Sequence, residues 1–193
     1  LAFYLPAFLH IGRNLGAERF TSCLAIYPRI ELLKDQLSEA FNQARSVAGI
    51  LAGHGKRKLS IGAFFGSTPN SSEEIDWDKG DGGYICPFFS CPEKRDGDKC
   101  DGELVWTDQD IKAGVERLVC THRGCDFSTH PDELLLTRKT LQSTPPDILF
   151  TTTEMVNQRM SDSRSWKLLG IQVPVHQRPS LVLLDEVHTY EGV

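Results

Sequence analysis

Two adjacent carboxylates, Asp185 and Glu186, directly follow the uninterrupted apolar run Leu181–Leu184. Such a run is typical of a strand buried on both faces in a parallel sheet. Ligands of open α/β sheets bind at the carboxyl ends of the strands. An aspartate there can hold a hydrated Mg²⁺ on a nucleotide, and a neighbouring glutamate can activate the attacking water. The pair therefore indicates a nucleotide site, and the alternative is an ordinary polar loop after a strand.

The cysteines form a second group that could do chemistry, because five of the six lie between Cys86 and Cys125. Cys120 and Cys125 are separated by four residues, and so are Cys86 and Cys91; thiolates at such spacings bind zinc. The sequence Cys-Asp-Gly-Glu-Leu at Cys100 resembles a zinc-ribbon knuckle, which favours pairing Cys100 with Cys91. We therefore predict that one structural Zn²⁺ is bound by Cys91, Cys100, Cys120 and Cys125, with Cys86 as a spare thiol or replacement ligand.

The spacing of apolar residues predicts the elements that position these groups. Helices are expected over 3–15, 30–47, 131–141 and 154–160, and strands over 22–27, 59–65, 147–151 and 180–185. Strands that alternate with helices indicate an α/β fold with a parallel sheet and right-handed crossovers.

Composition separates an inserted segment from the rest of the chain. The 193 residues are 40% apolar and 24% charged with a net charge of −5, which excludes a collagen, a coiled coil or a wholly disordered chain. Residues 70–103 carry ten acidic side chains against four basic ones. We therefore divide the chain into 1–69, an acidic cysteine-bearing insertion at 70–130, and 131–193. The insertion's aromatic residues could stack bases or, as we favour, pack a small core: Trp77, Tyr84, Phe88, Phe89 and Trp106.

Four segments, in the same order along the chain, resemble those of the superfamily 2 helicases of the DEAD/DEAH-box class. Residues 185–188 (Asp-Glu-Val-His) resemble motif II in its DExH form, and residues 27–36, which begin Tyr-Pro-Arg and end Asp-Gln, resemble motif Ia. Residues 66–69 (Gly-Ser-Thr-Pro) and 146–155 (beginning Pro-Asp-Ile) resemble the two segments between them. The match covers essentially all of the chain outside the insertion, whose position resembles Lhr-like and related bacterial helicases, some linked to phage defence.

The family's phosphate-binding loop, Gly-x-x-x-x-Gly-Lys-[Ser/Thr], is absent from the sequence. The nearest segment is 53–57 (Gly-His-Gly-Lys-Arg), where Ile50 stands in place of the first glycine and Arg57 in place of the hydroxyl that would reach Mg²⁺. Residues 1–6 resemble the helix that follows this loop. The resemblance therefore implies a partial RecA-like sheet that lacks its P-loop strand, interrupted by a small zinc-ribbon-like subdomain. We expect this chain alone to be inactive as an ATPase.

The resemblance also implies roles for the site residues. Asp185 would place Mg²⁺ on ATP, Glu186 would activate water and His188 would couple the site to a second lobe. The expected activity of the complete protein is ATP-dependent translocation on nucleic acid, DNA in preference to RNA, in the cytoplasm and without a membrane partner. In that reducing compartment zinc is favoured over disulfides. The alternative is a non-catalytic zinc-ribbon interaction module on a degenerate helicase-like scaffold.

Three segments of the resemblance would line a groove for one nucleic-acid strand. Small hydroxyls and backbone N–H groups suit phosphate oxygens, whereas the alternative is that these Ser and Thr side chains only cap helices. The predicted contacts are Pro28, Arg29, Gly66, Ser67, Thr68, Thr151, Thr152 and Thr153.

Overall fold

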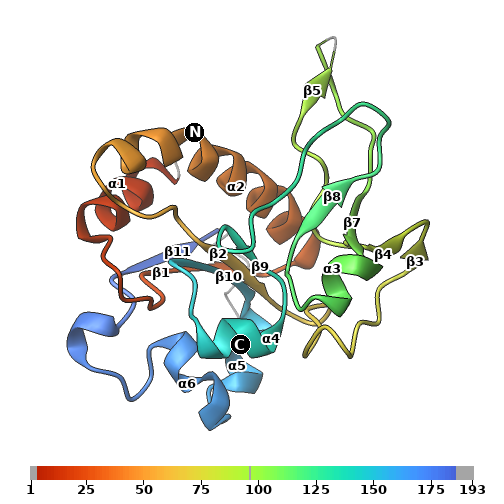
Figure 1. Ribbon diagram of the computed structural model, residues 1–193. Coiled ribbons are helices and arrows are strands. Elements are labelled where there is room, and N and C mark those ends of the chain that lie inside the picture. The colour runs from red at the N-terminus through yellow and green to blue at the C-terminus, as the bar shows by residue number, and fades with distance from the viewer. Residues whose placement is uncertain (1–3, 96, 186–193) are drawn as a thin grey trace.

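The main body is a five-stranded parallel sheet, seen edge-on near the centre of Figure 1. The computed structural model describes residues 4–95 and 97–185. The strand order is β11-β1-β10-β2-β9, and every neighbouring pair is parallel. The strands are β1 (Cys23–Tyr27), β2 (Ile61–Phe64), β9 (Leu134–Leu135), β10 (Ile148–Thr152) and β11 (Leu181–Leu184). The predicted α/β class with a parallel sheet is confirmed.

Helices cover both faces of this sheet (Figure 1). Alternate residues of a strand point to opposite faces, so Ala25 packs with α1 and α2 while Leu149 packs with α4, α5 and α6. The bounds are α1 (Leu5–Asn14), α2 (Ile30–Gly53), α4 (Arg138–Ser143), α5 (Thr153–Arg159) and α6 (Ser163–Leu169), with a 3-10 turn at Val175–Gln177. No helix in the described ranges combines the length and apolar character needed to cross a bilayer.

The insertion folds as a separate antiparallel sheet of order β3-β4-β7-β8. Its elements are β3 (Lys79–Gly80), β4 (Gly83–Ile85), β7 (Leu104–Thr107), β8 (Leu118–Cys120), the hairpin β5 (Lys94–Arg95) and β6 (Asp98–Lys99), and α3 (Asp108–Lys112). The rings of Phe89 and Phe127 lie against Phe41 of α2, with centroids 4.9 and 6.5 Å from it. The insertion's aromatic residues therefore do pack a core, but it is one that they share with α2.

The prediction of one helix over 131–141 is wrong. Leu134–Leu135 instead forms β9 beside β2, and α4 begins only at Arg138, where the Thr137 side chain caps the Thr140 N–H group. Glu116 of the insertion accepts hydrogen bonds from the Leu136 N–H group and the Thr137 hydroxyl, both at 2.6 Å. A tertiary contact from a distant segment thus overrides the local helical pattern.

The strand β11 lies at one edge of the sheet rather than buried on both faces. It pairs with β1 and with no other described strand. Leu181 and Leu183 pack against the core, whereas Val182 is 53% and Leu184 43% exposed. The expected parallel pairing is confirmed, but the expected burial on both faces is wrong for the described residues, because no described element covers the second face of β11.

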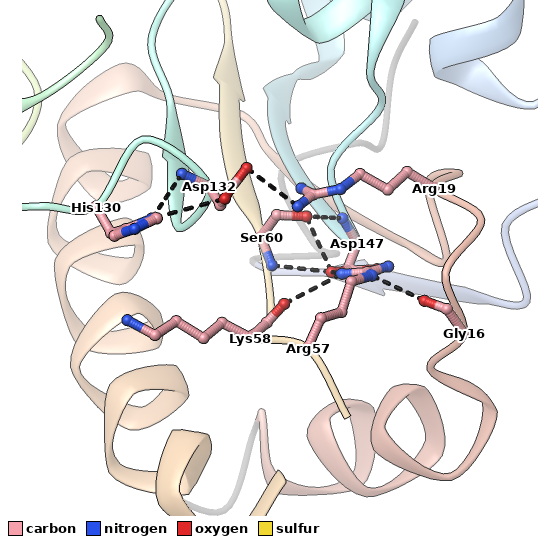
Figure 2. Close-up of polar contacts among 8 residues, drawn as sticks. All are labelled: Gly16, Arg19, Arg57, Lys58, Ser60, His130, Asp132 and Asp147. Atoms are coloured by element: carbon pink, nitrogen blue, oxygen red, sulfur yellow. Dashed lines mark hydrogen bonds and ion pairs between the residues drawn. The ribbon is translucent and has the colours of Figure 1, made fainter. Parts of the chain in front are cut away.

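A buried carboxylate joins β2 to β10 at the amino edge of the sheet (Figure 2). Asp147 is 2% exposed and accepts two hydrogen bonds from the Arg57 guanidinium group, at 2.6 and 2.7 Å. It also accepts from the Ser60 N–H group at 2.8 Å and the Ser60 hydroxyl at 2.9 Å. Arg57 donates further to the Gly16 carbonyl, so one ion pair ties three segments of the chain together.

The two lysines that flank Arg57, Lys56 and Lys58, also bond to partners within the fold. Lys56 donates to the Leu15 carbonyl at 2.8 Å, and Lys58 donates to the carboxylate of Glu133 at 2.6 Å. The basic run 56–58 precedes β2 and lies at the amino edge, away from the strand ends expected to carry function. These side chains stabilise the fold.

Candidate functional site

Four cysteine sulfur atoms of the insertion come together in one cluster. The Sγ atoms of Cys91, Cys100, Cys120 and Cys125 all lie within 4.8 Å of one another. The Cys91–Cys125 and Cys100–Cys120 pairs are 3.7 and 3.8 Å apart. Tetrahedral zinc with Zn–S bonds of about 2.3 Å spaces its sulfur ligands about 3.8 Å apart, whereas disulfide sulfurs are about 2.05 Å apart. The cluster could therefore hold a metal ion such as zinc.

Two turns bring these sulfur atoms together. Cys91 and Cys100 flank the hairpin β5–β6, closed by the Cys100 N–H group donating to the Glu93 carbonyl at 2.8 Å. Cys120 ends β8, and the Cys125 N–H group donates to the His122 carbonyl at 3.0 Å. The β5–β6 hairpin and β8 lie on the same side of the molecule in Figure 1. The pairing of Cys91 with Cys100 is the one that the sequence favoured.

The fifth cysteine, Cys86, lies outside this cluster. It is 7% exposed, and burial raises the pKa of its thiol to about 12 although the N–H groups of Phe88 and Phe89 act in the opposite direction. The charge of Lys34 also lowers this pKa, but burial outweighs it, so the thiol stays protonated at neutral pH.

The thiols within the cluster differ in their surroundings. Burial raises the pKa of Cys91, while a hydrogen bond from the Phe127 N–H group lowers the pKa of Cys125. His122 donates its backbone N–H group to the Cys120 sulfur at 3.4 Å, and its ring lies 2.6 Å from the Asp101 carboxylate. The Asp101–His122 pair was not found from the sequence, because its residues are distant in the chain and polar loops rich in such residues are common.

Gly102 stands where no larger residue fits. A Cβ atom at this position would lie 2.4 Å from the Cys120 sulfur and 2.9 Å from the His122 nitrogen. We expect Gly102→Ala to displace Cys120 and weaken metal binding by about 10–100-fold, the range for residues that support metal ligands. Competition titration with a chromophoric zinc chelator measures this change.

The control for this prediction is Gly49→Ala, because nothing lies within 4 Å of a Cβ atom at Gly49 in α2. It should leave metal affinity unchanged and raise helix stability by up to about 1 kcal/mol. Equal metal affinity for Gly102→Ala and the unmodified chain would show that the turn at Gly102 does not support the cluster.

The second candidate site is the carboxyl edge of the parallel sheet. The register aligns Leu184 of β11 with Ile26 of β1, Ile26 with Thr151 of β10, and Thr151 with Phe64 of β2. Four neighbouring strands therefore end in one row. The residues at or just beyond these strand ends are those that the sequence selected: Asp185, Pro28 and Arg29, Thr151 to Thr153, and Gly66 to Thr68.

Asp185 is half-buried at the end of β11, and its charge acts on the phenol group of Tyr4. The Tyr4 and Tyr27 hydroxyls hydrogen-bond to each other, and Tyr4 donates to Gln36 at 3.2 Å. Burial, Tyr27 and the negative charge of Asp185 together raise the pKa of Tyr4, so it stays a neutral donor. Glu186 and His188 lie outside the described residues.

Three of the predicted nucleic-acid contacts have roles within the fold. The Thr68 hydroxyl donates to the Ala63 carbonyl at 2.7 Å, and the Thr151 hydroxyl donates to the Phe64 carbonyl at 2.8 Å. Thr152 caps α5 by accepting from the Met155 N–H group, as the capping alternative foresaw. All three threonines are buried.

The remaining predicted contacts are at least partly exposed, although the hydroxyl of Thr153 is itself buried. Arg29 and Gly66 are exposed, and Pro28, Ser67 and Thr153 are half-buried. A strand of nucleic acid at this edge would therefore meet mainly Pro28, Arg29, Gly66 and Ser67.

Comparison with known proteins gives no further assignment. The chain matches no protein-family model and no curated protein.

Proposed function

We propose that this chain is part of the motor lobe of a superfamily 2, ATP-dependent nucleic-acid translocase. The observation that carries the proposal is the row of four strand ends, which brings Asp185 and the three nucleic-acid segments to one edge of the parallel sheet. This is the edge at which open α/β sheets bind their ligands. The order of the segments along the chain, and their resemblance to helicase motifs, support it independently.

In this proposal Asp185 holds Mg²⁺ on the ATP phosphates, and Glu186 activates the attacking water. The nucleic-acid segments bind the sugar-phosphate backbone, which requires no base-specific contacts. His188 and a second lobe would couple hydrolysis to movement, and lobe closure would advance the protein along the strand.

The test is Glu186→Gln in the complete protein that contains this chain. Removing a general base costs about 10²–10⁴-fold in rate, so nucleic-acid-stimulated ATP turnover should fall by that factor while ATP binding is unchanged. Phosphate release measures turnover and a fluorescent ATP analogue measures binding. Glu39→Gln is the matched control, because Glu39 is an exposed residue of α2 that bonds only to Gln43 in the described structure.

Undiminished turnover in Glu186→Gln would remove the assignment of the base. A complete protein that neither binds ATP nor carries a Gly-Lys-Thr or Gly-Lys-Ser sequence before Leu1 would instead favour the non-catalytic scaffold.

We also propose that the metal of the cysteine cluster is zinc and that it is structural. Four thiolates complete a tetrahedral site and leave no open position for substrate or water. The cluster lies in the insertion, and the aromatic residues beside it pack against α2. Zinc would thus hold the insertion in the shape that this shared core requires.

A further inference from the structure

An open, polar pocket of about 780 Å³ lies beside β2, α4, α5 and the start of α6, the helices grouped on one side of the sheet in Figure 1. Although the chain carries a net charge of −5, four basic side chains line this pocket and only two acidic ones do. The basic residues are Arg138, Lys139, Arg159 and Arg164, and the acidic ones are Glu74 and Asp162. The pocket is therefore a local concentration of positive charge.

The charges in this pocket are only partly compensated. Asp162 bonds to both Arg164 and Arg159, at 3.1 and 3.3 Å, and so fixes their positions. Neither Arg138 nor Lys139 forms an ion pair with any carboxylate in the described part of the chain. Burial and the nearby charge of Arg159 lower the pKa of Arg138, and the weaker influence of Asp76 raises it. Arg138 and Arg159 are therefore two like charges held near each other. An anion between them would relieve this repulsion.

Arg138 is held in place before any ligand binds. Its Nη2 atom donates to the carbonyls of Phe65 and Gly66, at 3.2 and 3.1 Å, and its guanidinium carbon lies 5.9 Å from the centre of the Phe64 ring. The Nε groups of Arg138 and Arg159 are buried and have no hydrogen-bond partner among the described residues. Preorganised guanidinium groups suit phosphate oxygens, because their geometry matches and little entropy is lost.

The position of the pocket indicates which class of ligand it binds. Arg138 bonds directly to Gly66, which begins one of the proposed nucleic-acid segments, and Arg159 ends α5, the helix that Thr153 begins. The pocket thus continues the row of strand ends beyond β2. We propose that Arg138, Lys139 and Arg159 bind backbone phosphate groups of a single-stranded nucleic acid. This inference rests on the proposed function and extends its nucleic-acid path to residues outside the helicase-like segments.

The test compares binding of a fluorescein-labelled oligothymidylate to the full chain and to Lys139→Gln/Arg159→Gln, by anisotropy over a salt series. Arg138 is left intact because its contacts to Phe65 and Gly66 support the fold. Each phosphate contact to a single strand contributes about 0.7 to the slope of log affinity against log salt, so the slope should fall by about 1.4. Arg13→Gln/Lys112→Gln, which removes two exposed charges on α1 and α3, should leave the slope unchanged.

Arg159→Lys, which keeps the charge, should keep most of the affinity. An unchanged circular dichroism spectrum and unfolding midpoint of the double variant show that its loss of affinity does not come from misfolding. Unchanged affinity and slope in the pocket variant would overturn the proposal, as would an equal loss in the Arg13→Gln/Lys112→Gln control. Inorganic phosphate that binds the pocket in a chain that does not bind the oligonucleotide would also overturn it, because the ligand would then be free phosphate.

This result is separable from that of the proposed function. Pocket-dependent oligonucleotide binding in a protein without ATP turnover would reject the proposed motor function and support the proposed role of the pocket. ATP turnover together with oligonucleotide binding that does not depend on the pocket would support the motor function and reject the role of the pocket.

Discussion

Cys120→Ser combined with Cys125→Ser should release the metal and unfold the insertion. These residues supply two of the four sulfur atoms that lie within 4.8 Å of one another. Structural zinc contributes about 10–16 kcal/mol of apparent binding free energy in zinc-finger peptides, which is comparable to the whole stability of an ordinary domain, about 5–15 kcal/mol. Metal content per chain should fall from one to zero by elemental analysis.

The loss should extend beyond the insertion. Phe89 and Phe127 pack on Phe41 of α2, and Arg45 of α2 lies over the Phe127 ring at 5.0 Å. When the cluster opens, these contacts lose their support, so we expect faster amide hydrogen exchange in the middle of α2 as well as in 70–130. Exchange that increases only within the insertion would show that the shared core does not transmit the change.

Cys86→Ala is the control for this variant. Cys86 is buried, as are Cys91, Cys100 and Cys120, but it lies outside the cluster, so the variant should keep one metal ion per chain. Metal retained after Cys120→Ser/Cys125→Ser, or lost in Cys86→Ala, would contradict the assignment of the ligands.

The cluster could be predicted from the sequence because its information is local. Each pair of cysteines closes one turn, and the Cys-x-Gly-x-Leu pattern at Cys100 marks a turn that needs a glycine; Gly102 is indeed crowded by the Cys120 sulfur. The same pattern favoured Cys100 over Cys86 as the partner of Cys91. The Asp101–His122 contact carries no such signal, since it forms only after the two turns meet.

The carboxyl edge could be predicted in the same way, because parallel strands must end together. The strand β9 could not, since Leu134–Leu135 has too few residues to show a period and is held by Glu116 from the insertion. The positive pocket was also missed. Arg138 and Arg159 are separate in sequence, and each alone resembles a solvent-exposed helix residue.

The role of the basic run 56–58 could not be predicted from the sequence either. A cluster of lysine and arginine suggests a surface, and the sequence does not show that Arg57 has a buried carboxylate partner 90 positions later in the chain. The structure identifies Asp147 as a structural residue by its position. It directly precedes β10, and it lies opposite Ser60, which directly precedes β2.

Asp147→Asn should therefore lower the free energy of unfolding by about 3–5 kcal/mol, the cost of breaking a buried ion pair by removing one partner. The carboxylate accepts from Arg57 twice and from Ser60 twice, and an amide can replace only part of these acceptors. Urea unfolding followed by circular dichroism measures the change. The matched control is Asp108→Asn, which removes an exposed ion pair to Lys79 at 3.2 Å and should cost less than about 1 kcal/mol.

The destabilising effects of substitutions at Arg57 and Asp147 should also be non-additive. In Arg57→Leu/Asp147→Leu no charge is left unpaired, so the double variant should be less destabilised than the sum of the two single variants. Because Asp147 spans β2 and β10 at the edge opposite the proposed ligands, its loss should alter stability without changing the salt dependence of oligonucleotide binding. Equal losses of unfolding free energy for Asp147→Asn and Asp108→Asn would show that the buried network does not hold β2 and β10 together.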